Sequence, residues 1–68
     1  MKEIKTVQIV DVESKDSATA VVRAAEGVVA LALSLKHDGD IELFLSVEDC
    51  RRLSAAMDEA LLLASRGE

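Results

Sequence analysis

The stretch Ile41–Ala64, IELFLSVEDCRRLSAAMDEALLLA, decides the fold, because a strand pattern runs into a helix pattern there with a single serine between them. Apolar residues occupy every second position at Ile41, Leu43 and Leu45, which is typical of a half-buried strand. Ser46 is the predicted N-cap of the helix, since its hydroxyl can accept a hydrogen bond from the backbone N–H of Asp49. The stretch therefore predicts a strand that enters a helix directly.

The predicted helix ends at Gly67 and carries one apolar stripe at a spacing of about 3.6 residues. The stripe consists of Val47, Cys50, Leu53, Met57, Ala60, Leu61 and Ala64. Leu61 is therefore assigned to the core of the chain. Leu62 and Leu63 fall on the two sides of the stripe, flanked by Ala55 and Ala56, and we expect this surplus apolar surface to meet another chain.

Upstream of the helix, four segments alternate in the strand manner and are separated by short polar breaks. They are Ile4 to Glu13, Ala18 to Ala25, Val28 to Lys36 and Asp40 to Leu45. The sequence therefore predicts an α+β fold of order ββββα. It is a four-stranded antiparallel β-meander with one C-terminal helix packed on one face, and residues 1–68 form a single small domain.

The alternation of apolar and polar residues predicts the turns between these strands, since a shift of the strand pairing by one residue would move every side chain to the other face. A two-residue loop at Glu26-Gly27 keeps the apolar residues on one face. For the last hairpin, a three-residue loop at His37–Gly39 with Gly39 left-handed pairs Leu35 with Ile41. In the first strand, the apolar residues switch from one face to the other along the strand. This switch favours either a bulge near Ile9-Val10 or partial burial of both its faces.

Composition excludes several classes of protein. Half of the chain is hydrophobic but only 1% is aromatic, so disorder is not expected. The formal net charge of −5 disfavours generic binding to phosphate backbones. Cys50 is the only cysteine, which rules out an intrachain disulfide and favours a reducing, cytoplasmic setting. Charges interrupt every apolar run long enough for a membrane span, so no membrane partner is expected.

Catalytic constellations are not indicated by the sequence. Cys50 falls in the first helical turn, where a thiol can become nucleophilic, but it also lies on the predicted buried stripe. His37 is the only histidine and lies in a hairpin tip, where a solvated turn residue is the simpler interpretation. Known nucleotide-binding, hydrolase and zinc spacings are missing. We therefore expect no enzyme, no catalytic or metal-binding residues and no cofactor.

Phe44, the only aromatic residue, alternates onto the face opposite Ile41 and Leu43. Two interpretations stay open for it. Either the outer face of the sheet is partly covered by a tail or a bend, or Phe44 belongs to a contact surface.

The order of four strands and then a helix that begins LFLSVEDCRRL is similar to that of the Whirly and positive-cofactor-four single-stranded DNA binders. Those proteins lay bases on a curved sheet and dimerise through their helices. The resemblance implies nucleic-acid contact through Arg23, Lys36 and Phe44. These residues do not form a basic stripe with several stacking aromatics, as such a face ordinarily does.

The sequence predicts a non-enzymatic small acidic protein-interaction module, acting as a regulator, adaptor or inhibitor. We expect a homodimer that binds an unidentified protein. The predicted dimer or partner interface consists of Leu62, Leu63, Ala55, Ala56 and Phe44. Two alternatives remain, namely single-stranded nucleic-acid binding on the open sheet face and small-ligand binding at a dimer interface.

Overall fold

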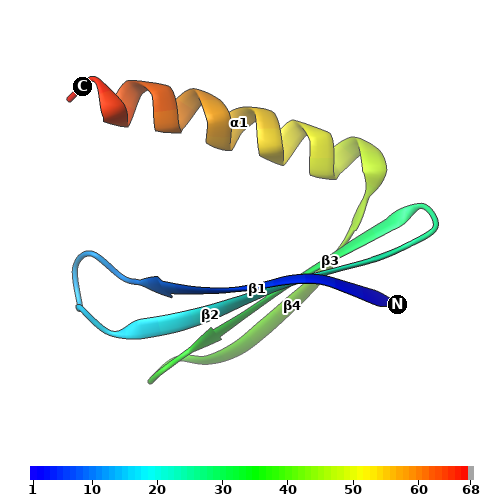
Figure 1. Cartoon of the computed structure of the whole chain (residues 1–68), viewed down its shortest axis with the longest axis horizontal. Helices are drawn as coiled ribbons and strands as arrows, with labels where there is room; N and C mark the ends of the chain where they lie inside the picture. The colour runs from blue at the N-terminus through cyan, green and yellow to red at the C-terminus, as the bar shows by residue number, and fades with distance from the viewer. Residues whose placement is uncertain (68) are drawn as a thin grey trace.

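The computed structural model describes residues 1–67 and has the predicted order ββββα (Figure 1). Four antiparallel strands lie in one sheet in the order β1-β2-β3-β4, and a single helix follows the last strand. The elements are β1 (Lys2–Val10), β2 (Ser17–Ala25), β3 (Val28–Leu35), β4 (Gly39–Ser46) and α1 (Val47–Ser65). Because every connection joins neighbouring strands, β1 and β4 are the two edges of the sheet.

Local chemistry sets the ends of α1 as predicted. The Ser46 hydroxyl accepts a hydrogen bond from the backbone N–H of Asp49 at 3.1 Å, so the strand becomes a helix without a connecting loop. Gly67 follows the helix with a φ of +80°. In the first turns of the helix, the Arg52 guanidinium contacts the Asp49 carboxylate at 3.2 Å.

The turn between β2 and β3 is the predicted two-residue loop. Ala25 pairs with Val28, and Gly27 adopts a φ of +76° between them. This pairing keeps Ala20 opposite Leu33 and therefore keeps the apolar residues of both strands on one face.

The pairing of β3 with β4 differs from the prediction by two residues. Leu35 pairs with Gly39 and Leu33 with Ile41, whereas the sequence suggested Leu35 with Ile41. Gly39 is left-handed as expected, with a φ of +81°. A shift of two residues leaves every side chain on its predicted face, so hydrophobic phase alone does not distinguish the two registers.

The irregularity of β1 lies near its start rather than at Ile9-Val10. The register with β2 shifts between Glu3 and Lys5, which leaves Ile4 as the extra residue. This bulge places Glu3 directly opposite Arg23 on β2, but the Arg23 guanidinium is paired with Glu42 and the Glu3 carboxylate accepts a hydrogen bond from the Thr6 hydroxyl. The strand also ends at Val10 and not at the predicted Glu13.

The helix leaves the sheet soon after it begins. Within residues 1–67, α1 approaches β3 and β4 but neither β1 nor β2. In Figure 1 it runs above the sheet as a separate layer. Leu61 was assigned to the core, but it is 66% exposed, so that assignment is wrong for the single chain. The buried apolar residues among those described are Ala18 and Ala30.

Candidate interaction surfaces

The helix face of the sheet, defined as the side toward α1, is almost entirely apolar. Cross-strand pairing puts three apolar residues of β4 on this face together with their partners on the other strands. Its apolar members are Val7, Ile9, Ala18, Ala20, Val22, Ala24, Val29, Leu31, Leu33, Leu35, Ile41, Leu43 and Leu45, and Lys2, Lys5 and Gly39 share the face with them. A face of this composition needs an apolar cover.

The chain supplies only a partial cover. A hollow of about 290 Å³ opens between α1 and the helix face, bounded by Cys50, Leu53 and Met57 on the helix side and by Val22 and Leu31 on the sheet side. Met57 remains 65% exposed although it borders this hollow. The helix therefore stands off the surface that its apolar stripe matches.

The solvent-accessible surface area shows how much surface the chain leaves uncovered. The chain exposes 5571 Å², whereas a folded monomer of its mass of 7.3 kDa is expected to expose about 4,200 Å². The excess of about 1,400 Å² per chain corresponds to about 2,800 Å² for two chains, which is within the range of obligate dimer interfaces.

Large apolar side chains account for this surplus. Sixteen of them are exposed in the described part of the chain. They are Met1, Ile4, Val7, Ile9, Val10, Val12, Leu35, Ile41, Leu43, Phe44, Val47, Leu53, Met57, Leu61, Leu62 and Leu63. Most lie on the helix face or on α1, so the exposed apolar surface is concentrated on one side of the molecule.

The outer face of the sheet, opposite α1, has a different character. Arg23, Ala30 and Phe44 form one cross-strand row, and Ala30 in its middle is fully buried. Arg23 is paired with the carboxylate of Glu42 on β4, and the Ser34 hydroxyl donates to Asp40 at 2.5 Å. The acidic side chains of β4 are therefore engaged within the chain.

A shallow hollow of about 380 Å³ also lies on the outer face. Thr19 and Val21 border it on β2, and Ser34, Asp40 and Glu42 border it on the other side. Because the bordering carboxylates are already hydrogen bonded or paired, the hollow presents few free polar groups to a ligand.

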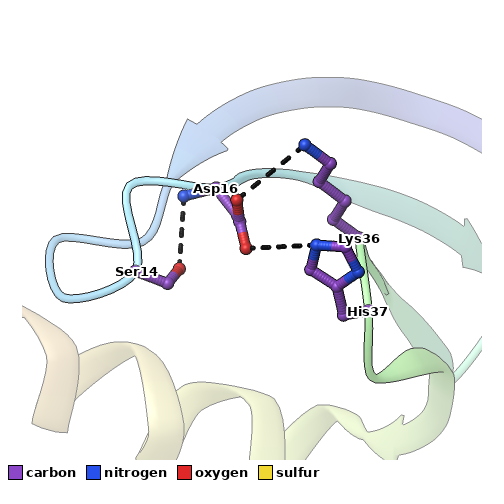
Figure 2. Close-up of polar contacts among 4 residues, drawn as sticks. All are labelled: Ser14, Asp16, Lys36 and His37. Atoms are coloured by element: carbon purple, nitrogen blue, oxygen red, sulfur yellow. Dashed lines mark hydrogen bonds and ion pairs between the residues drawn. The ribbon is translucent and has the colours of Figure 1, made fainter.

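Lys36 is at the far end of the sheet from Arg23. As Figure 2 shows, the side chains of Lys36 and His37 both point toward Asp16, and the Ser14 hydroxyl accepts from the Asp16 backbone N–H at 3.2 Å. The Lys36 ammonium is 3.9 Å from one Asp16 oxygen, and the His37 Nε2 is 3.7 Å from the other. These contacts join the β1–β2 loop to the β3–β4 turn.

Of the three residues suggested for nucleic-acid contact, Arg23 and Phe44 share one cross-strand row, but Lys36 does not join them. Leu35, next to Lys36, pairs with Ala18, which is five residues from Arg23 along β2 and so about 17 Å away. Both cations also have a carboxylate nearby, so the outer face offers little free positive charge to a phosphate backbone.

The predicted protein interface divides between two surfaces. Leu62, Leu63, Ala55 and Ala56 are all exposed on α1, whereas Phe44 is on the outer face and 63% exposed. By helical spacing, Leu62 follows Ala55 and Leu63 follows Ala56 on the two sides of the apolar stripe, and Leu63 is the less exposed of the two leucines, at 44% against 54%.

Sequence reasoning missed that Met57, Leu61, Ile41 and Leu43 also belong to the exposed apolar surface. Their spacing predicted that they face inward, but apolar spacing indicates only that a surface needs an apolar cover and not which chain supplies it. Chain length was the signal available for this exposure, because 68 residues are barely enough to form and cover one hydrophobic core.

Residues 1–67 contain no group of three or more His, Cys, Asp or Glu side chains arranged to hold a metal ion. The helix α1 is not apolar enough over a sufficient length to cross a membrane.

Comparison with known proteins adds no relative to this description. No family model matches the chain, and searches of curated proteins and of solved structures returned no significant match.

Proposed function

We propose that this chain is a non-enzymatic interaction protein that acts as a homodimer and binds another protein as a regulator, adaptor or inhibitor. The uncovered helix face is the observation that carries the proposal. A chain that exposes about 1,400 Å² more than a monomer of its size gains most by burying that surface against a second copy.

The outer face is the proposed surface for the protein partner. It stays accessible when the helix face is covered, and it carries Phe44 as an exposed aromatic side chain. Aromatic residues at the centre of a contact surface often carry much of the binding energy. The net charge of −5 favours a partner whose binding surface is basic. A reducing, cytoplasmic setting belongs to the same proposal, because Cys50 is the only cysteine.

Equilibrium sedimentation tests the dimer. We expect twice the mass of the chain at micromolar concentration, together with a urea midpoint that rises with protein concentration. Leu61→Ser should lower the fraction of dimer, because it puts a hydroxyl in the apolar stripe. Arg51→Ser is the matched control on the charged side of the helix and should leave association unchanged.

A well-folded monomer at tens of micromolar would contradict the proposal. Circular dichroism of the same samples separates loss of association from loss of folding, because a folded monomer keeps its helical signal.

A further inference from the structure

We infer that two copies join along their β4 strands, in an antiparallel pairing centred on Leu43 that makes one continuous eight-stranded sheet. This inference rests on the proposed homodimer and adds the surface through which it forms. It follows from the difference between the two edges of the sheet, the charges on β4 and the position of α1.

The β4 edge is open and regular. β4 pairs with β3 at eight consecutive positions without a shift, so its other side presents an unbroken row of backbone N–H and C=O groups. Ile41 and Leu43 on its helix face and Phe44 on its outer face are all at least half exposed. α1 approaches β3 as well as β4 and runs above the sheet as a separate layer, not beside β4 in the plane of the sheet (Figure 1).

The β1 edge has the features that oppose pairing. Its bulge at Ile4 interrupts the ladder, and Lys2 and Lys5 flank that bulge. Bulges and lysines are the usual means by which an edge strand avoids joining another sheet. β4 is therefore the edge suited to a second copy.

Symmetry and charge select the register. In an antiparallel pair, residues directly opposite each other have the same hydrogen-bonding orientation. A two-fold axis between two identical strands must therefore place one residue directly opposite its own copy, and the pairing is centred on that residue. Centring on Glu42 sets two carboxylates directly opposite each other, which is destabilising. Centring on Phe44 leaves only Glu42–Ser46 in the ladder. Centring on Leu43 pairs all of Asp40–Ser46 and sets each Glu42 opposite a Phe44.

This register also joins the two apolar surfaces. Opposed residues of a strand pair project to the same side of a sheet, so Leu43 meets its copy and Ile41 meets Leu45 on the helix face. Both α1 helices then lie on one side of the eight-stranded sheet. Their exposed stripes can cover each other and the seam, which accounts for the surplus surface on α1.

Site-specific disulfides test the register in a Cys50→Ala background. Leu43→Cys should form a disulfide-linked dimer under mild oxidation, since its Cα atoms would be about 4.5–5.5 Å apart. Ile41→Cys and Leu45→Cys should each remain unlinked when oxidised alone, because identical positions would be about 14 Å apart. When these two variants are refolded together, they should give a linked heterodimer.

The outcomes separate this inference from the proposed function. A dimer in sedimentation without a link at Leu43→Cys and without the mixed Ile41→Cys and Leu45→Cys link would overturn the β4 pairing and leave the homodimer standing. The β4 pairing would also be overturned if Leu43→Cys, Ile41→Cys and Leu45→Cys, each oxidised alone, formed disulfide-linked dimers to the same extent. A monomeric Cys50→Ala chain and a monomeric unaltered chain would contradict both. The mixed pair still decides the register if Leu43→Cys fails to fold.

Discussion

Arg23 on β2 and Glu42 on β4 form an ion pair that crosses β3 on the outer face of the sheet. Arg23 also lies directly opposite Ala30, which is fully buried. The long arginine side chain therefore ties three strands together and covers the small residue between them. This contact uses one of the cations expected to meet a nucleic acid.

A double-mutant cycle measures that contact. Both side chains are 36% exposed, so Arg23→Met and Glu42→Gln should show a coupling free energy of at most about 1 kcal/mol. Urea unfolding at one fixed protein concentration gives the four free energies. The coupling should decrease in high salt, and a salt-independent coupling well above that value would show that the pair is effectively buried.

The cap of α1 gives a second prediction. Ser46→Ala should lower the free energy of unfolding by about 1 kcal/mol, because the Asp49 N–H loses its partner at the junction of β4 and α1. Ser65→Ala is the matched control in the last turn, where the hydroxyl donates to the Leu61 carbonyl. It should change stability by less than about 0.5 kcal/mol. Equal losses for both variants would argue against a capping effect.

Backbone conformation gives two predictions of opposite sign. Gly27 has a φ of +76° with open space around it, so Gly27→Ala should cost about 1 kcal/mol through backbone strain alone. Lys15 has a φ of +67° in the β1–β2 loop, so Lys15→Gly should leave stability unchanged or raise it. Thermal unfolding at fixed concentration checks both. A stabilising Gly27→Ala would contradict the left-handed turn.

The leucine triplet gives a prediction about association. Leu63 is less exposed than Leu62, at 44% against 54%, so Leu63→Ser should weaken the dimer by roughly tenfold or more in dissociation constant, which corresponds to the loss of one buried leucine. Leu62→Ser, at the more exposed of the two positions, should weaken it less. Sedimentation over a concentration series gives both constants. A larger effect at Leu62 would mean that the partner contacts the opposite side of α1.

Sequence patterns predicted the elements, their order and the faces of the sheet, but not every register. Alternation has a period of two, so it distinguishes Leu33 facing α1 from Leu33 facing outward. It does not distinguish Leu33 paired with Ile41 from Leu33 paired with Leu43. The actual pairing depends on the conformation of the residues between Leu35 and Gly39, which short-range composition describes poorly.

The candidate surfaces were predictable only in part for a related reason. Apolar spacing predicted a stripe on α1, but it carries no information about whether Leu61 meets its own sheet or another chain. The bulge at Ile4 was also missed, because it is a shift in the register between β1 and β2, which is not visible within either strand.

The bulge at Ile4 limits how far assembly can proceed. Once two β4 edges are joined, the strands left at the ends of the sheet are the two copies of β1, each interrupted at Ile4 and flanked by lysines. Such ends do not template another strand. The same irregularity that breaks the first hairpin would therefore stop growth at two chains and keep an apolar, strand-rich protein from forming fibres.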